Sequence, residues 1–294
     1  MDAKSIKSIH TEMQSMYIFF VYSVKLYMMS DNMLELKNVS KFYYKKGIVS
    51  SGISKVTLKF DMGEFIAITG ESGSGKSTLL NVISGLDTYE EGEMYVNGEE
   101  TSHYNEEDYE EYRKKYIGNI FQSFNLVNSY TVYQNVELVL LINGETRKSV
   151  KHKVIDILKK VDLYKYRHTK VSKLSGGMKQ RVAIARCLAK DAPIIIADEP
   201  TGNLDSKNAK SVLKLLYEIS KYKLVIVVTH NFEQISEYAT RRITMHDGSV
   251  IEDMKLKDKN EVKEVNTSKF KKTKVISNLR LGIRNTFNIV PKFL

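Results

Sequence analysis

The sequence predicts an α/β fold built on a parallel β-sheet, and three observations carry this prediction. A glycine-rich run, Gly70 to Ser77, follows the apolar run Glu64 to Thr69 and precedes a segment with helical spacing. A second apolar run, Ile194 to Ala197, ends in two carboxylates. Between this run and the apolar run Leu224 to Val228, residues Ser206 to Ser220 place apolar side chains at i, i+3, i+4 and i+7. A strand, a helix and a second strand in this order imply parallel pairing.

The composition is that of an ordinary globular chain. Its 294 residues are 42% hydrophobic and 27% charged, with 3 Pro and 16 Gly, which argues against a disordered or fibrous protein. The single cysteine, Cys187, cannot form an internal disulfide, so a reducing compartment is expected. Cys187 has apolar helical neighbours, and we interpret it as a packing residue.

The net charge of +10 would suit nucleic acid, anionic lipid or phosphorylated ligands. The charge is uneven, because Ile251 to Leu294 holds eleven Lys and Arg against five Asp and Glu. Most of the surplus therefore lies at one end of the chain, and the body is not expected to bind nucleic acid.

The first 32 residues are interpreted as an extension of unknown role. Their most apolar run, Met16 to Met29, is shorter than the roughly 20 residues of a spanning helix and is interrupted by Lys25. The start of the chain also lacks the pattern of a signal peptide. Met33 opens the first strand-like segment, Leu34 to Val39.

The other elements are expected in the following order. Strand signals lie at Val56 to Phe60 and at Glu93 to Val96, the latter followed by the hairpin pair Asn97 and Gly98. Tyr104 to Tyr116 is interpreted as a solvated helix with charge pairs. A helical middle follows, with apolar spacing over three ranges: Val132 to Ile142, Val150 to Val161 and Met178 to Leu188.

The glycine-rich run fits the phosphate-binding pattern G-x-x-x-x-G-K-[ST] at every position. Its glycines let backbone N–H groups curl around phosphate oxygens, and the following helix offers its positive end to the same anion. Lys76 would neutralise phosphate charge, and the Ser77 hydroxyl would ligate Mg²⁺. The residues expected to bind the nucleotide here are Gly70, Ser72, Gly73, Ser74, Gly75, Lys76, Ser77 and Thr78.

The two carboxylates after the second apolar run are Asp198 and Glu199. In a parallel sheet this position lies beside a nucleotide bound at the carboxyl ends of the strands. Asp198 suits the Mg²⁺ shell, and Glu199 suits a general base that polarises the attacking water.

A third motif, Leu174 to Arg181 (LSGGMKQR), resembles the LSGGQ signature of ATP-binding cassette (ABC) ATPases. It lies between the phosphate loop and the carboxylates, as in that family, and departs from it in having Met178 where Gln is usual. The resemblance covers about Met33 to Glu252. It implies a P-loop NTPase fold of ABC type, with an antiparallel β subdomain and an α-helical subdomain between Gln122 and the signature.

The resemblance also implies roles for individual residues. Gln122 resembles the Q-loop glutamine, which senses the γ-phosphate and contributes to the metal site, and His230 the switch histidine. Asp205 resembles the D-loop aspartate. Tyr43 resembles the aromatic residue that stacks on adenine, with Tyr44 as its rival. The signature residues Ser175, Gly176 and Gly177 would contact the nucleotide held by another subunit.

We therefore expect a head-to-tail dimer, most simply a homodimer, around two ATP with Mg²⁺. Hydrolysis would drive a membrane permease of the FtsX-like type found in the macrolide-export and lipoprotein-release branch. We expect the chain at the cytoplasmic face of the cell membrane, where the permease and the basic tail would attach it. The alternative is a soluble ABC ATPase acting on ribosomes or DNA. It is disfavoured because the chain has one cassette and because Ser175 follows Lys76 by only 99 positions. A kinase or GTPase lacks the signature.

The tail completes the expected organisation. The predicted domains are an extension at 1–32, the ATPase at 33–252, a charged linker at 253–273 and a basic amphipathic segment at 274–294. In this last segment apolar residues recur beside Arg280 and Arg284. It is either a helix packing on the ATPase or a membrane-surface helix that precedes a permease region.

Overall fold

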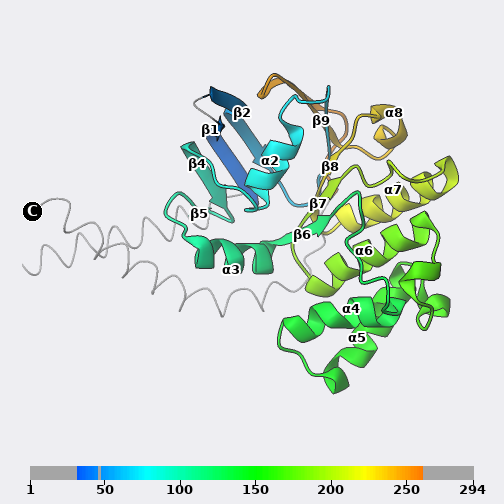
Figure 1. Ribbon diagram of the computed structural model, residues 1–294. Helices are drawn as coiled ribbons and strands as arrows, with labels where there is room; N and C mark the ends of the chain where they lie inside the picture. The colour runs from blue at the N-terminus through cyan, green and yellow to red at the C-terminus, as the bar shows by residue number, and fades with distance from the viewer. Residues whose placement is uncertain (1–31, 46–47, 261–294) are drawn as a thin grey trace, which may run out of the picture. The chain divides into compact units, whose positions relative to one another are not determined.

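The computed structural model describes residues 32–45 and 48–260 (Figure 1). In this part of the chain, four strands form an antiparallel sheet in the order β2-β1-β4-β5. They are β1 (Leu34–Lys45), β2 (Ile48–Phe60), β4 (Glu91–Val96) and β5 (Glu99–Glu100). The hairpin predicted at Asn97 and Gly98 joins β4 to β5, and both residues have positive φ, as a type I′ turn requires. The predicted antiparallel β subdomain is present.

A second sheet of six strands has the order β10-β9-β3-β8-β7-β6, and all its neighbours are parallel except β9 and β10. Its strands are β3 (Phe65–Gly70), β6 (Ile117–Ile120), β7 (Ile194–Asp198), β8 (Leu224–Val228), β9 (Arg241–His246) and β10 (Ser249–Lys255). The three runs predicted to pair in parallel are β3, β7 and β8, at the centre of this sheet. The predicted parallel sheet is therefore confirmed.

Alternating residues of the central strands belong to two separate cores. On β3, Phe65 and Ala67 pack with the helices α4 to α7, whereas Ile66 and Ile68 pack with α2, α3 and the antiparallel sheet. The helices of the first core are α4 (Val132–Ile142), α5 (Arg147–Lys160), α6 (Gly176–Lys190) and α7 (Ser206–Ser220). Those of the second are α2 (Lys76–Ile83) and α3 (Glu106–Tyr116), and a short helix α8 (Phe232–Ile235) follows β8.

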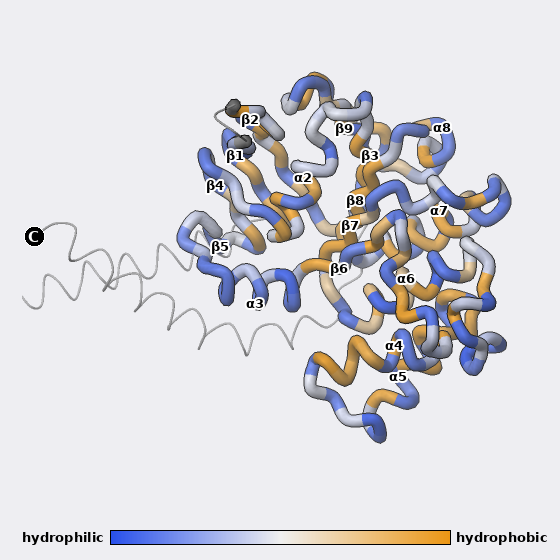
Figure 2. Tube along the Cα trace, in the orientation of Figure 1, coloured by the Kyte–Doolittle hydropathy of each residue, from blue (hydrophilic) through white to orange (hydrophobic). Residues whose placement is uncertain are grey.

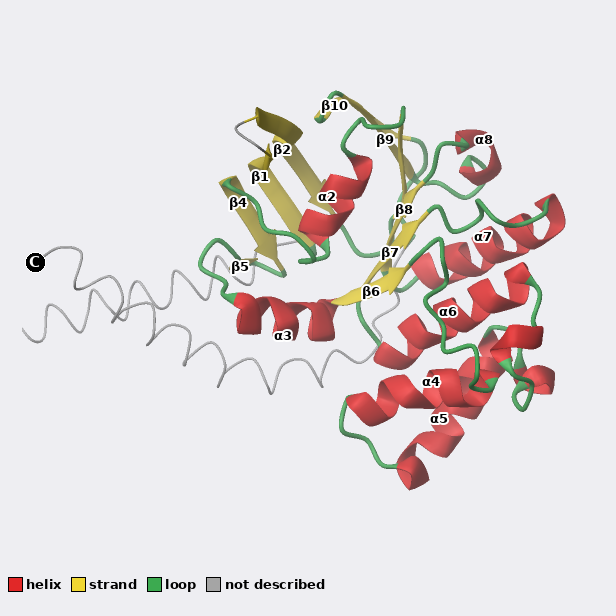
Figure 3. Ribbon diagram, in the orientation of Figure 1, coloured by secondary structure: helices red, strands yellow, loops and turns green. Residues whose placement is uncertain are grey.

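The two groups of helices lie on opposite faces of the six-stranded sheet (Figure 3). The strands between them are continuously apolar (Figure 2), as expected for parallel strands covered on both faces. The predicted α-helical subdomain corresponds to α4 and α5, which lie between Gln122 and the signature.

Helix α3 differs from its prediction as a solvated helix. Tyr109, Tyr112 and Tyr116 are buried in the second core, and the charged residues occupy the other face. The helix is amphipathic, with tyrosines on its buried face. The prediction was wrong because it considered the many charged residues and not the spacing of the tyrosines.

The described fold also extends beyond Glu252, where the predicted ATPase domain was expected to end. Strand β10 continues to Lys255, and the Asn260 side chain donates hydrogen bonds to Gly63 O and Ser220 Oγ. The first eight residues of the predicted linker, 253–260, therefore belong to this fold. The extension at 1–31, the rest of the linker and the segment at 274–294 lie outside the described residues. Within the described part, no helix has both the length and the apolar character needed to cross a membrane.

Candidate functional site

The phosphate loop joins the end of β3 to the start of α2. Gly73 and Gly75 have φ of 82° and 93°, a conformation that glycine adopts without strain. A Cβ on Gly75 would lie 2.4 Å from Gly52 O, so the close approach of β2 also requires glycine. No side chain caps α2, and its first N–H groups therefore remain available to an anion.

The Lys76 side chain lies folded into this loop. Its Nζ donates hydrogen bonds to Gly70 O at 3.0 Å, Glu71 O at 2.6 Å and Ser74 Oγ at 3.2 Å. Ser74 is buried, whereas the Ser72 and Ser77 side chains are exposed, and Thr78 is half-buried. The loop thus concentrates one cation, several N–H groups and hydroxyls around a single turn.

Asp198 is the last residue of β7 and lies close to Lys76 and Glu199. Burial raises the pKa of Asp198, the charge of Glu199 raises it further, and Lys76 opposes both effects. The strand register places Asp198 opposite Val228 at the end of β8. The two carboxylates and the phosphate loop therefore share the carboxyl edge of the sheet, as predicted.

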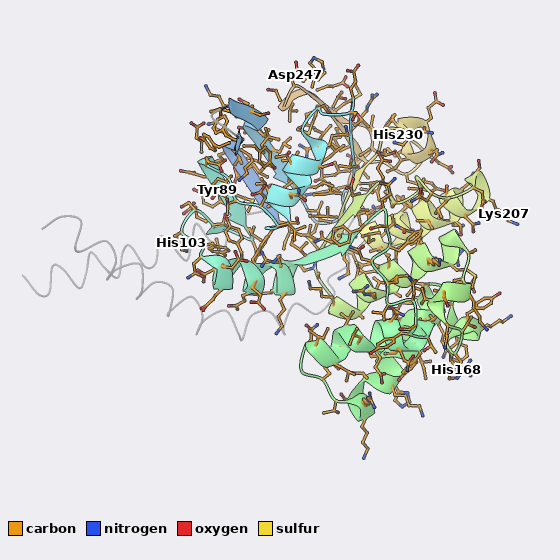
Figure 4. All side chains as sticks on the ribbon, viewed as in Figure 1. Tyr89, His103, His168, Lys207, His230 and Asp247 are labelled. Carbon is orange, nitrogen blue, oxygen red and sulfur yellow. The ribbon has the colours of Figure 1, made fainter. Side chains whose placement is uncertain are left out.

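Glu199 and His230 are in direct contact. Glu199 Oε1 accepts a hydrogen bond from the His230 backbone N–H at 3.0 Å and lies 2.8 Å from His230 Nδ1. Glu199 has φ of 45°, which is rare for a non-glycine residue and is stabilised by its N–H bond to Val228 O. His230, labelled in Figure 4, lies in the turn between β8 and α8 with an exposed side chain.

Gln122 follows β6, the strand beside β7. Its Nε2 lies 3.2 Å from the point where a Cβ on Gly202 would stand, and its backbone oxygen is 3.4 Å from Asn203 Nδ2. Gln122 is therefore at the same edge as Asp198 and next to the loop that follows Glu199.

The donor set suits Mg²⁺. Among residues 32–45 and 48–260, no group of three or more His, Cys, Asp or Glu could hold a metal ion by itself. Ser77, Asp198 and Gln122 offer a hydroxyl, a carboxylate and an amide oxygen, and Mg²⁺ characteristically combines few protein oxygens with phosphate oxygens and water.

The signature residues lie at the start of α6 and contact the loop before α7 and the first turn of α7. The Ser175 hydroxyl accepts a hydrogen bond from the Met178 N–H at 3.4 Å. A Cβ on Gly177 would lie 2.6 Å from Asn208 Oδ1, and one on Gly176 would lie 3.2 Å from a methyl carbon of Leu204. Asp205 caps α7 by accepting from the Asn208 N–H at 3.0 Å, and this bonding lowers the pKa of Asp205.

Tyr43 and Tyr44 lie on opposite sides of β1, as successive strand residues do. The Tyr43 ring and Thr78 both approach Gly52, lying 2.7 and 2.8 Å from the point where its Cβ would stand. Tyr44 is 72% exposed, against 40% for Tyr43. The geometry thus places Tyr43 beside the first turn of α2.

Two contributions to this region were not predicted. The turn between β9 and β10 supports the phosphate loop, because the Gly248 N–H donates to Ser74 O and Met245 O lies against Gly70. Asp247 in this turn is labelled in Figure 4, and its Asp-Gly pair is a hairpin signal of the same kind as Asn97-Gly98. The second is Asp87, which accepts a hydrogen bond from the Tyr43 hydroxyl.

The chain resembles known proteins over most of the described part. Residues 53–202 match the family described as ABC transporter. A structure of MJ0796, titled as a dimeric post-hydrolysis state of the ATP-binding cassette bound to ADP and Pi, aligns with a TM-score of 0.70 at 38% identity. The alignment covers 77% of this chain and all of that one.

Curated relatives include both import and export proteins. The methionine import protein MetN of Clostridium acetobutylicum is 42% identical over 75% of this chain and 68% of its own length. The lipoprotein-releasing protein LolD 1 of Chlorobium chlorochromatii is 38% identical over 78% and 94%. The macrolide export ATP-binding/permease protein MacB of Bdellovibrio bacteriovorus is 35% identical over 86% of this chain and 40% of its own length.

Proposed function

The chain belongs to the ABC transporter family of ATP-binding subunits, and we propose that two copies close head to tail around two ATP to drive a membrane permease. One observation carries this proposal: the phosphate loop, Asp198, Glu199, Gln122 and His230 gather at the carboxyl edge of one parallel sheet. That arrangement can hold a nucleoside triphosphate and activate water against its last phosphate.

In this proposal the phosphate loop binds the β- and γ-phosphates. The uncapped N–H groups of α2 accept the anion, and Lys76 exchanges its three loop acceptors for phosphate oxygens. Mg²⁺, held by Ser77, Asp198 and Gln122, would neutralise phosphate charge.

Glu199 acts as the general base and His230 holds it in place. Both contacts from His230 fall on Oε1, and Oε2 makes no hydrogen bond within the described residues. Oε2 is therefore able to accept a proton from water, while the His230 contacts fix the carboxylate plane.

The signature serves the nucleotide of the second copy. Helix α2 packs on one face of the six-stranded sheet and α6 on the other, so the two glycine-rich helix starts do not face one site within a single chain. A closed two-fold dimer would bring Ser175, Gly176 and Gly177 of each copy, with Asp205 nearby, to the phosphate loop of its partner.

Exposed apolar side chains offer a contact for the permease. Val127 and Tyr130 lie on the segment between Gln122 and α4, and Tyr164 and Tyr166 lie before α6. Backbone bonds join the two segments, including the one from the Val171 N–H to Tyr130 O. Because this surface continues from Gln122, a permease seated on it would respond to the nucleotide.

Within the family we assign the chain to the export and lipoprotein-release branch with an FtsX-like permease. Similarity to LolD and MacB supports the assignment, as does the basic amphipathic sequence at 274–294. Similarity to MetN is expected too, because the cassette supplies force and the permease selects the cargo. The chain would then act at the cytoplasmic face of the membrane, held there by the permease and the tail.

The test is a tagged Glu199→Gln variant in the presence of ATP and Mg²⁺. The variant should bind ATP, elute as a dimer in size-exclusion chromatography and hydrolyse ATP at least about 100-fold more slowly than wild type. Wild-type-like hydrolysis would remove Glu199 from its role. Glu218→Gln, the same change at an exposed carboxylate near the end of α7, serves as the matched control.

The same variant, purified from detergent-solubilised membranes of the source cells, tests the partner. Recovery of a multispanning permease would support the transport function. Recovery of ribosomes or nucleic acid with an intact dimer would instead favour the soluble ATPase alternative.

A further inference from the structure

We propose that Asp87 is a positioning residue for the nucleotide base, holding the Tyr43 ring in its stacking position through the Tyr43 hydroxyl. The inference rests on the proposed function together with the role that the family resemblance implies for Tyr43, which is to stack on adenine. It adds a residue outside every motif of the sequence, and it links base recognition to the helix that binds the phosphates.

The Tyr43 ring is fixed at two points. Its hydroxyl donates a hydrogen bond to Asp87 Oδ2 at 3.0 Å. Its edge lies against Gly52, where a Cβ would stand 2.7 Å from the ring and 2.8 Å from Thr78. One contact at the tip and one at the edge define both side-chain torsions, so the ring loses little further freedom when a base stacks on it.

Asp87 is itself held by a buried cation. Lys41 Nζ lies 2.9 Å from Asp87 Oδ1 and 2.9 Å from Glu90 Oε1, and Lys41 is only 6% exposed. Burial lowers the pKa of Lys41, but its hydrogen bonds and charge interactions with the two carboxylates outweigh burial and raise it. Asp87 Oδ1 also accepts the Thr88 N–H at 2.9 Å. The carboxylate that meets Tyr43 is thus oriented by Lys41 and the Thr88 N–H as well as by the Tyr43 hydroxyl.

The backbone attaches Asp87 to α2. The N–H groups of Leu86 and Asp87 both donate to Asn81 O, at 2.9 and 3.2 Å. Helix α2 begins at Lys76, in the phosphate loop, so it carries phosphate ligands at one end and the support of Tyr43 at the other. A shift of α2 would therefore move both ends of the nucleotide site together.

The experiment measures binding of ATP and of inorganic tripolyphosphate to the full-length chain by isothermal titration calorimetry. Tripolyphosphate carries the phosphates without a base. Tyr43→Phe keeps the ring and removes the hydroxyl, Asp87→Ala removes the acceptor, and Asp87→Asn keeps an acceptor for the hydroxyl. A Tyr43→Phe/Asp87→Ala double variant completes the cycle.

We expect Tyr43→Phe and Asp87→Ala each to weaken ATP binding about three- to tenfold while leaving tripolyphosphate binding unchanged. The double variant should be no weaker than Asp87→Ala, and Asp87→Asn should recover most of the affinity. Equal losses for ATP and tripolyphosphate, or additive losses in the double variant, would overturn the proposal.

Tyr43→Ala separates this proposal from the proposed function. If its ATP affinity equals that of wild type, Tyr43 does not stack on adenine and the role of Tyr43 itself is wrong. If Tyr43→Ala weakens ATP binding and Tyr43→Phe does not, only the positioning role of Asp87 fails. Tyr43→Phe leaves Lys41, Asp87 and Glu90 paired, so it tests the proposal even if Asp87→Ala does not fold.

Discussion

Two helices of this chain begin at glycine-rich turns, and they differ in what they bring to an anion. Helix α2 has no side-chain cap and begins with Lys76. Helix α6 is capped by Ser175 and begins with two glycines and Met178, so its first three residues carry no charge. The start of α2 can bind a phosphate by itself. The start of α6 offers only amides and a hydroxyl, which suit a phosphate whose charge is already neutralised by other groups. In the proposed dimer, each chain would therefore supply two different halves of a shared site from opposite faces of its sheet.

The largest effect is expected from a substitution at the start of α2. Lys76→Ala removes the cation of the loop and should weaken ATP binding by the single chain about 100-fold, measured by calorimetry. Lys179→Ala, the corresponding change in α6, should alter the affinity less than about twofold. Similar losses in both variants would mean that the two helix starts are equivalent.

Gly177→Ala changes the start of α6. Its Cβ would lie 2.6 Å from Asn208 Oδ1 and 2.8 Å from Asn208 Cβ, so the helix start must move. We expect steady-state ATP hydrolysis to fall roughly tenfold or more, because a small displacement in a closed site is costly, with ATP affinity of the single chain unchanged. Loss of ATP affinity would place the signature in the same site as the phosphate loop of its own chain.

A mixture of the Lys76→Ala and Gly177→Ala variants tests the same comparison. In a dimer of Lys76→Ala with Gly177→Ala, one of the two sites combines an intact phosphate loop with an intact signature. The mixture should therefore hydrolyse ATP faster than either variant alone at the same total concentration. If the mixture hydrolyses ATP no faster than the average of the two variants alone, the site is not shared.

A smaller effect is expected from the cap of α6. Ser175→Ala removes a 3.4 Å bond to the Met178 N–H and should cost about 0.5 kcal/mol of stability, with a severalfold loss of turnover. Thr131→Ala removes the corresponding cap of α4, where the bond is 3.2 Å, and should cost about 1 kcal/mol without loss of turnover. Urea unfolding and ATPase assays on both variants separate capping from nucleotide contact.

The last prediction concerns the far end of α2, where we expect a change in stability without a change in nucleotide contact. The Tyr112 hydroxyl donates to Ile83 O and the Arg113 guanidinium to Gly85 O, so α3 satisfies carbonyls at the end of the phosphate-loop helix. Tyr112→Phe should lower the free energy of unfolding by about 1 kcal/mol. Tyr95→Phe, whose hydroxyl bonds the exposed Glu93, should change it by only a few tenths. Equal changes would mean that the Tyr112 bond contributes no specific support.

The sequence was most informative where a pattern is local. The ranges predicted for α4, α7 and β8 coincide with those observed, because apolar spacing within one element fixes its period and ends. Strand β6 was missed because four residues with a glycine carry no period. The hairpin of β9 and β10 was missed although Asp247-Gly248 marks its turn.

The residues of the candidate site also fall into two groups, those within a contiguous motif and those that meet only in the folded chain. The loop, the carboxylates and the signature are contiguous motifs, and they were found. The Glu199 contact with His230 and the Tyr43 contact with Asp87 join residues that are 31 and 44 positions apart. Such residues come together only when the strands take their places in the sheets, and no local sequence pattern reveals that order.

Sheet order also governs when this protein can fold during synthesis. Strand β3, which carries the phosphate loop, is made early, but its two neighbours are β8 and β9, with Phe65 opposite Val225 and Ile66 opposite Arg241. The turn that supports Ser74 and Gly70 comes later still, at Met245 to Gly248. The emerging chain must therefore keep an apolar strand unpaired while about 160 further residues leave the ribosome, a high contact order that slows folding and exposes an aggregation-prone edge.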